Sequence, residues 1–246
     1  MRRTDLLSQT SEFGASSFPS FESFHPTLSV DSWGLHGNAG MPSNCSQIYE
    51  NLNECSGPNV ISQRNYPCDS HIRAYFGDVD LFTTGRKSFQ KQLLQCMISQ
   101  MLWMKGEIEQ LRSTNSFGSL IWQLNENWPT GGWGLLEYGS RPHEEGQVMG
   151  GRWKPLMHLL QRSLFRDVFA TCGVAIDGFN YGTRRCFIRN DGVRIVTAKL
   201  IIELWEFRGK THSIFSKEFT LNPNGDTGES NRTICYAFIK EVAVYY

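Results

Sequence analysis

The hydrophobic pattern predicts one long helix near the middle of the chain, over residues 88–112. Apolar residues recur there at steps of three and four, which places them along one helical face. Ser88 is a suitable N-cap residue for this helix. The apolar positions are Phe89, Leu93, Met97, Met101, Met104, Ile108 and Leu111. This methionine-rich face indicates core packing rather than a cofactor site. A second helix is predicted over residues 152–166, where Pro155 falls in the first turn and is tolerated.

Strand patterns stand on both sides of that second helix. Residues 117–124, FGSLIWQL, predict a short buried strand. After about residue 168 the chain changes to β-rich runs separated by turn residues, namely RCFIRN, IVTAKLIIELWEFRG, KTHSIFSKEFTL and TICYAFIKEVAVYY. Their spacing is typical of an antiparallel β-sandwich. We therefore expect two domains, one over residues 1–168 and the other over residues 169–246.

Residues 14–70 show neither a helical period nor a strand-like alternation for long. They are rich in Ser, Gly, Pro and Asn and carry single aromatic residues at intervals. Connections of this length are usually functional or disordered. The frequent aromatic residues favour an ordered, packed segment.

Composition mainly excludes classes of partner. The chain has 246 residues, a formal net charge of zero and a hydrophobic share of 40%, which is enough for a packed core. Zero net charge argues against a nucleic-acid partner. No apolar window is long enough to span a membrane, and the first residues lack the apolar stretch of a signal peptide. We expect no nucleic-acid or membrane partner.

Metal and nucleotide chemistry find no support in the motifs. The six histidines do not pair at helical spacing, and the seven cysteines contain no C-x-x-C pair. Phosphate-binding loops, dinucleotide fingerprints and the serine-hydrolase elbow are also missing. The sequence therefore predicts neither a metal nor a cofactor. The odd cysteine count does not favour a disulfide framework, although one or two bridges around Cys45, Cys55 and Cys68 stay open.

The segment SLIWQLNENWPTGGWGLLEYG, residues 119–139, carries the most distinctive chemistry. Trp122, Trp128 and Trp133 lie within a dozen residues where the predicted strand ends, and Glu126 and several amides stand between them. Indole faces stack on the C–H faces of sugar rings, while carboxylates and amides bind hydroxyl groups, which is the mixture a small-ligand site needs. Alternatively, the indoles fill a core and the polar groups cap the loop backbone. The residues alone leave both interpretations open.

A second acidic position is Glu12, in TSEFGASSFPSFESF, residues 10–24. By itself a glutamate before Phe-Gly is usually a surface acid. Together the two segments resemble the β-mannosidases and their relatives in glycoside hydrolase family two. The first is similar to the family's nucleophile segment. The second, with the following GGRWKPLMHLL, is similar to its last barrel strand and helix. The resemblance covers about residues 8–170, and the later strands fit the family's C-terminal Ig-like domains.

This resemblance implies the C-terminal portion of a (β/α)8 TIM barrel, its last two strand–helix units, followed by an Ig-like β-sandwich. It implies that Glu12 is the nucleophile of a retaining glycosidase. It implies that Trp122 is a platform under the sugar, and that Glu126, Trp128 and Trp133 help to bind the substrate. The implied function is hydrolysis of terminal β-D-mannose from oligosaccharides. The alternatives are an exo-β-glucosaminidase or another β-glycosidase of the family, a non-catalytic carbohydrate-binding remnant, and a structural β-sandwich without ligand.

The chain departs from the family in one respect. In the family, the acid/base glutamate follows an asparagine at the end of the fourth barrel strand, upstream of the nucleophile. These 246 residues hold no matching segment. We therefore expect a C-terminal fragment that is inactive alone. The family and the sequons at Asn44 and Asn231 suggest a lysosomal or secreted protein, while linkage specificity and oligomeric state stay open.

Overall fold

The computed structural model describes residues 10–36, 61, 68–113, 118–138, 151–172, 186–205, 209 and 211–224. The chain divides into two compact units. The tryptophan unit comprises residues 9–107 and 119–161, and it holds six of the seven tryptophans. The β unit comprises residues 1–8, 108–118 and 162–246. The domain boundary expected near residue 168 stays a prediction.

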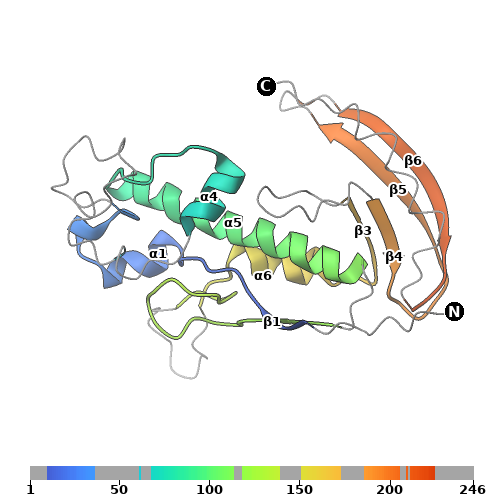
Figure 1. Cartoon of the computed structure of the whole chain (residues 1–246), viewed down its shortest axis with the longest axis horizontal. Coiled ribbons are helices and arrows are strands. Elements are labelled where there is room, and N and C mark those ends of the chain that lie inside the picture. The colour runs from blue at the N-terminus through green and yellow to red at the C-terminus, as the bar shows by residue number, and fades with distance from the viewer. Residues whose placement is uncertain are drawn as a thin grey trace, which may run out of the picture. The chain divides into compact units, whose positions relative to one another are not determined.

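The described elements follow the chain in a mixed order (Figure 1). They are β1 (Thr10–Phe13), α1 (Phe21–Phe24), the 3-10 turns η1 (His25–Thr27) and η2 (Val30–Ser32), α4 (Cys68–Phe76), α5 (Arg86–Ser113), β2 (Ser119–Ile121), α6 (Pro155–Leu159), the π-helical turn η4 (Leu160–Leu164), β3 (Val168–Cys172), β4 (Cys186–Asn190), β5 (Val196–Trp205) and β6 (Thr211–Leu221).

Helix α5 confirms the prediction of one long helix. It begins at Arg86, so the expectation that Ser88 is its N-cap is wrong. Its apolar face is core, as predicted, because Phe89, Leu93, Met104 and Ile108 are fully buried. The second helix is also confirmed. It begins at Pro155, and its last turn is π-helical.

The main core of the tryptophan unit lies between α1, α4 and the first half of α5. Phe21 and Phe24 of α1 both contact the ring of Phe89 on α5. A disulfide joins Cys68 of α4 to Cys96 of α5, and both residues are buried. Figure 1 shows α4 beside α5. Phe18, Phe21 and Phe24 therefore pack into an ordered core, with Trp33 against it, as expected, while Tyr49 and Tyr66 lie outside the described residues.

Helix α4 falls at the end of the stretch in which no helix was predicted. Only Cys68 and Ile72, four residues apart, are buried within it. Two apolar positions are too few to establish a helical period in the sequence. Its partner cysteine, Cys96, was not among the bridge candidates. Cys45, Cys55 and both sequons lie outside the described residues.

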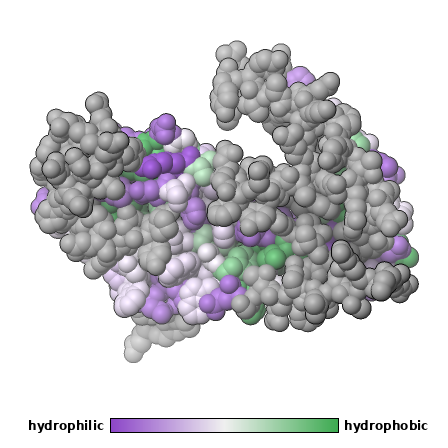
Figure 2. Space-filling view, in the orientation of Figure 1, coloured by the Kyte–Doolittle hydropathy of each residue, from purple (hydrophilic) through white to green (hydrophobic). Residues whose placement is uncertain are grey.

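Strands β1 and β2 pair in parallel. β2 is shorter than predicted, and the expectation of a buried strand is wrong, because Leu120 is 61% exposed. In Figure 2 hydrophobic residues reach the surface in the part of the view where Figure 1 draws β1. An apolar run predicts a buried strand only where other elements cover both of its faces, and the described residues leave Leu120 uncovered.

The β unit contains two antiparallel strand pairs, β3 with β4 and β5 with β6. Three of the four predicted β-rich runs are confirmed as strands, and the fourth, residues 233–246, lies outside the described residues. Ile188 of β4 packs with Phe219 and Leu221 of β6 in a small core. One core shared by two strand pairs is compatible with sheet-on-sheet packing. The Ig-like sandwich and the TIM barrel stay predictions.

Arg112, in the last turn of α5, is the polar centre of the described β unit. Its guanidinium group donates to the carboxylate of Asp191, with an Nη2–Oδ2 distance of 2.5 Å, and also to the carbonyl oxygens of Leu164 and Arg166. It also lies over the ring of Phe169, with 3.7 Å between its central carbon and the ring centroid. One side chain therefore joins the end of α5 to three later segments of this unit.

Candidate active site

The parallel pairing of β1 and β2 brings Glu12 and Trp122 to one place in the tryptophan unit. Thr10 pairs with Ser119 and Phe13 with Ile121, so β1 carries one extra residue between the paired positions. Ser11 and Glu12 therefore both stand opposite Leu120. Because alternate residues of a strand share a face, Trp122 lies on the same face as Leu120. The register thus places Glu12 and Trp122 on one face of neighbouring strands.

A glycine permits this close approach. The Trp122 N–H donates to the carbonyl oxygen of Phe13 at 2.9 Å, which extends the ladder by one bond past β2. A Cβ atom on Gly14 would lie 2.1 Å from the Trp122 carbonyl oxygen. Any larger residue at position 14 would push the two strand ends apart. The peptide bond from Trp122 to Gln123 is cis.

The segment just after β1 is anchored to α5. Gln100 of α5 is fully buried, and its side-chain amide donates to the carbonyl oxygen of Ala15 at 2.8 Å. Ser17 and Gly132 exchange two backbone hydrogen bonds of 2.7 and 2.9 Å. These bonds fix the chain that follows Glu12 against both α5 and the segment after Trp122.

The tryptophan loop, residues 122–137, folds back on itself after β2. The N–H of Gln123 donates to the carbonyl oxygen of Trp133, and the N–H of Leu135 donates to that of Gln123. Within this loop Trp122 is 47% exposed and Trp128 is 68% exposed, while Trp133 is half-buried. The indoles of Trp122 and Trp128 therefore have faces available to a ligand. The alternative in which all three rings fill a core does not hold for the described residues.

Glu126 differs from the tryptophans because it points into the protein. The residue is buried, and its Oε1 atom lies 2.9 Å from the Nζ atom of Lys154. The same oxygen accepts the N–H of Gly134 at 2.7 Å. These bonds and this burial favour a structural role for Glu126 over the direct sugar contact that the resemblance implied.

Sequence reasoning missed two residues of this buried network, Lys154 and Glu137. Glu137 is buried, and its Oε2 atom accepts hydrogen bonds from the hydroxyl groups of Ser20 and Ser23, at 2.7 and 2.5 Å. Burial lowers the pKa of the Lys154 amine, and attraction to Glu126 and then to Glu137 opposes that shift. In sequence, Lys154 falls in the first turn of the predicted helix as an ordinary charged residue, which gives no sign of its burial.

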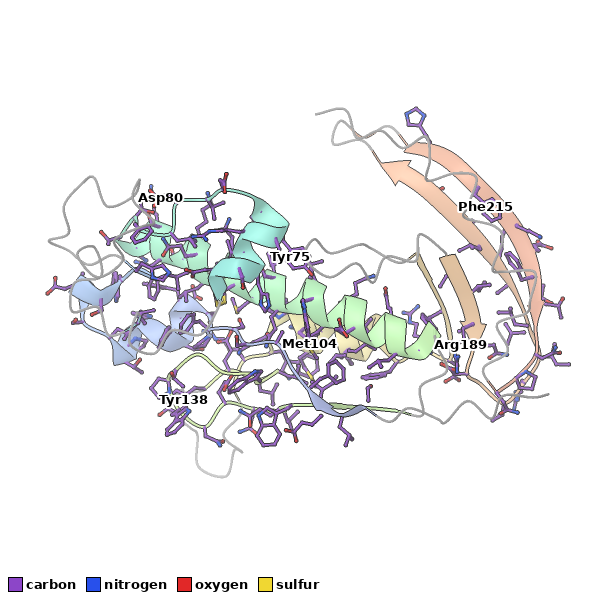
Figure 3. The ribbon with its side chains drawn as sticks, viewed as in Figure 1. Tyr75, Asp80, Met104, Tyr138, Arg189 and Phe215 are labelled. Carbon is purple, nitrogen blue, oxygen red and sulfur yellow. A yellow bond between two sulfur atoms is a disulfide. The ribbon has the colours of Figure 1, made fainter. Side chains whose placement is uncertain are left out.

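The arrangement is suited to binding an uncharged polar ligand with apolar faces. The exposed Glu12 and Trp122 lie at the ends of parallel strands, and the exposed Trp128 lies in the loop that follows. The two carboxylates of this loop, Glu126 and Glu137, are bonded inside the protein. Among the described residues, no group of three or more His, Cys, Asp or Glu side chains is placed to hold a metal ion. No helix in the described ranges combines the length and the hydropathy needed to cross a bilayer. Tyr138, which follows the loop, is labelled in Figure 3.

Comparisons with known proteins agree with the sequence resemblance. No family model matches the chain. Over 164 residues the chain is 26% identical to "Beta-mannosidase" from Mus musculus, an alignment that covers 63% of this chain and 16% of the mouse protein. The crystal structure of "Beta-D-Mannosidase" from Dictyoglomus thermophilum matches with a TM-score of 0.56, at 21% sequence identity. The chain is β-mannosidase-like.

The β-mannosidase-like chain corresponds to only part of each relative. The structural match covers 88% of this chain and 22% of the bacterial enzyme. The sequence match covers 16% of the mouse protein. Since 88% of the chain exceeds either unit alone, the likeness in fold extends over parts of both units.

Proposed function

We propose that this chain carries the nucleophile and the sugar platform of a β-mannosidase-type retaining glycoside hydrolase that acts on terminal β-D-mannose residues of oligosaccharides. The observation that carries the proposal is the parallel register of β1 and β2, in which Glu12 and Trp122 share one face. The sequence match to a β-mannosidase supports the choice of sugar. The exposure of Trp122 and Trp128 supports a ligand that stacks on indoles.

In the proposed reaction an oxygen of the Glu12 carboxylate attacks the anomeric carbon of the bound mannose. The bond from that carbon to the leaving-group oxygen breaks, and the leaving oxygen takes the bonding pair and a proton from a second carboxylic acid. Water then cleaves the glycosyl ester with inversion, so that the two steps together retain the configuration. Trp122 holds the sugar ring over the strand ends during both steps.

The proposed reaction also needs a proton donor. A retaining mechanism places two carboxyl groups about 5–5.5 Å apart. The two carboxylates of the tryptophan loop are both engaged inside the protein, Glu126 with Lys154 and Glu137 with Ser20 and Ser23. Neither is placed to protonate a leaving group. We therefore expect the isolated chain to be inactive on substrates whose leaving group needs a proton, unless another polypeptide segment supplies the acid.

Covalent trapping tests the nucleophile without that acid. The chain is incubated with 2-deoxy-2-fluoro-β-D-mannosyl fluoride, whose fluoride leaves with its electron pair and needs no protonation. The anomeric carbon becomes esterified to the attacking carboxylate, and the electronegative 2-fluorine slows hydrolysis of that ester. Peptide mass spectrometry is expected to find the 2-fluoromannosyl group on Glu12.

The matched control is Glu12→Gln, which keeps the size of the side chain and should remain unlabelled. Glu22 is a second exposed carboxylate in the same segment and serves as an internal reference for non-specific labelling. Label on Glu22 or another surface acid, equal in Glu12→Gln and in the unsubstituted chain, would refute the assignment. Turnover of an aryl β-mannoside that is lost in Glu12→Gln would support the nucleophile but contradict the expected inactivity.

A non-catalytic carbohydrate-binding role is the second candidate. It is favoured by the 47% and 68% exposure of Trp122 and Trp128 together with the internal engagement of both loop carboxylates. In that case Glu12→Ala still binds mannobiose and Trp122→Ala does not. Tryptophan fluorescence measures the binding. Parallel titrations with β-linked glucosamine and galactose disaccharides distinguish mannose specificity from that of other β-glycosidases.

The disulfide bears on the compartment. Disulfides persist in secreted proteins and in oxidising compartments and are rare in the cytosol. The buried bridge between Cys68 and Cys96 therefore supports a secreted or lysosomal location. The test is the free thiol content of the protein isolated from its own cells, in which the peptides of Cys68 and Cys96 should resist alkylation until they are reduced.

A further inference from the structure

Two buried carboxylates belong to the tryptophan loop and one buried lysine lies next to it, and the proposed chemistry uses none of the three side chains. Lys154 is fully buried, and Glu126 and Glu137 are nearly so. Charged groups are rarely buried without partners, because they lose their hydration. Their partners therefore indicate what the burial accomplishes.

The first set of bonds is made by the Glu126 carboxylate inside the loop. Oε1 of Glu126 is bound to the Lys154 ammonium group and to the Gly134 N–H. A Cβ atom on Gly132 would lie 2.3 Å from Oε2 of Glu126, and one on Gly134 would lie 2.8 Å from its carboxyl carbon. The two glycines let the backbone close directly around this carboxylate. The conformation of residues 126–134 is thus built around a side chain that Lys154 holds.

The second set of bonds connects the loop to the segment after β1 and to the segment before α6. Glu137, at the end of the loop, accepts hydrogen bonds from Ser20 and Ser23, which follow β1. Its N–H donates to the carbonyl oxygen of Arg152, and the N–H of Lys154 donates to that of Leu135. The segment after β1, the loop and the segment before α6 therefore meet at these side chains.

The two exposed indoles lie on the backbone that this network fixes. Glu126 stands four residues after Trp122 and two residues before Trp128 in the sequence. We infer that Glu126, Lys154 and Glu137 are positioning residues that set how Trp122 and Trp128 are presented to a sugar. This inference rests on the proposed function in so far as the ligand is a sugar. The network acts through the loop and does not touch the ligand.

The test uses the purified full chain and three variants. Lys154→Met removes the buried cation at nearly constant length. The double variant Glu126→Gln/Lys154→Met leaves no unpaired charge at the pair, and its amide oxygen can still accept the Gly134 N–H. Arg112→Met is the control, because it removes a partly buried cation whose partners Asp191, Leu164 and Arg166 all belong to the β unit.

Two readouts are taken at a temperature at which each variant is folded by far-ultraviolet circular dichroism. The first is the dissociation constant for mannobiose from intrinsic fluorescence. The second is the acrylamide quenching constant, which reports the tryptophan unit because it holds six of the seven tryptophans. In Lys154→Met we expect sugar affinity to fall by about tenfold, which corresponds to about 1.4 kcal/mol, and quenching to increase. The double variant should show the same changes at smaller size, and Arg112→Met should show neither.

A purely stabilising network would give another result. Lys154→Met and the double variant would unfold at lower temperature, but their folded molecules would bind and quench as the unsubstituted chain does. That result overturns the inference. If Lys154→Met does not fold, the double variant decides by the same two readouts.

Failure of the proposed function looks different from failure of this inference. If the unsubstituted chain binds no mannobiose, the sugar proposal fails, and the quenching comparison alone decides about positioning. Increased quenching in the Lys154 variants and not in Arg112→Met then supports a network that orders the loop. Equal quenching in all variants overturns it.

Discussion

The tryptophan unit and the β unit each contain a cationic side chain that is bonded to a carboxylate, but they bury it to different depths. The Lys154 side chain is 0% exposed and that of its partner Glu126 is 2% exposed, whereas those of Arg112 and Asp191 are 15% and 30% exposed. In the first case, water cannot replace a lost partner, and in the second it can in part. The depth of burial, more than the number of hydrogen bonds, therefore decides how much each unit depends on its cation.

The two units also differ in their strands. β5 and β6 pair over ten positions in a local antiparallel hairpin, whereas β1 and β2 pair at two positions across more than a hundred residues of chain. A short parallel pair depends on what packs around it. The proposed site therefore stands on the part of the fold that has the least local support.

The largest effect is expected from the disulfide of the tryptophan unit. Replacing Cys68 and Cys96 together by alanine should lower the free energy of unfolding of this unit by about 2–4 kcal/mol, because the bridge closes a loop with a sequence separation of 28 residues. Urea unfolding followed by tryptophan fluorescence measures the change. The reduced unsubstituted chain is the control and should match the double variant. A change below about 1 kcal/mol would contradict the assignment of a stabilising bridge.

A smaller effect is expected from Arg112→Met in the β unit. The substitution removes hydrogen bonds to Asp191 and to the carbonyl oxygens of Leu164 and Arg166. Since Asp191 is partly exposed and also bound to Arg189, the loss should be roughly 1.5–3 kcal/mol. Circular dichroism in the strand region during urea unfolding measures it. Arg112→Lys should recover part of the loss, because it keeps the charge. If Arg112→Met shifts the fluorescence transition, which reports the tryptophan unit, as far as the circular dichroism transition of the strands, the difference between the two units is refuted.

The smallest effect is pH dependent and involves Tyr75 of α4, which is labelled in Figure 3. Burial, and then the charge of Glu107 on α5, raise the pKa of Tyr75 to about 12. The unfolded chain ionises this tyrosine near its ordinary pKa of about 10. Stability from this group is therefore fully present below about pH 10 and is lost as the pH rises toward 12.

Tyr75→Phe should remove that alkaline loss. The measurement is the urea midpoint of the fluorescence transition at several pH values in this window, for the unsubstituted chain and the variant. Lys154 acts in the opposite direction, since its lowered pKa makes stability rise with pH up to the ordinary lysine value. Only the difference between the two proteins therefore reports Tyr75, and parallel pH curves would refute the prediction.

Much of the local structure was predictable. The step of three to four residues from Phe89 to Leu111 predicts helix α5, and the β-rich runs between turn residues predict three of the strands of the β unit. The resemblance by itself identifies Glu12 and Trp122 as candidate site residues. In contrast, α4 was missed because only two of its residues face the core.

The candidate site was only partly predictable. Trp122 and Trp128 were chosen for their chemistry and are exposed, but Glu126 was assigned to the ligand and instead faces Lys154. In sequence a glutamate between two tryptophans can point either way. Two glycines that admit its carboxylate, and a lysine 28 residues later, fix its direction in the structure.

The sequence by itself determined which long segments are periodic and whether each is a helix or a strand, because such segments depend on neighbours within a few residues. It also supplied the residue types that stack on sugars or attack them. Only the tertiary structure decided that Glu12 and Trp122 share a face, that Cys68 pairs with Cys96, and that Lys154 is buried. Each of these outcomes depends on contacts between segments far apart in the chain, where register and burial are set by packing and by the pairing of polar groups that water cannot reach.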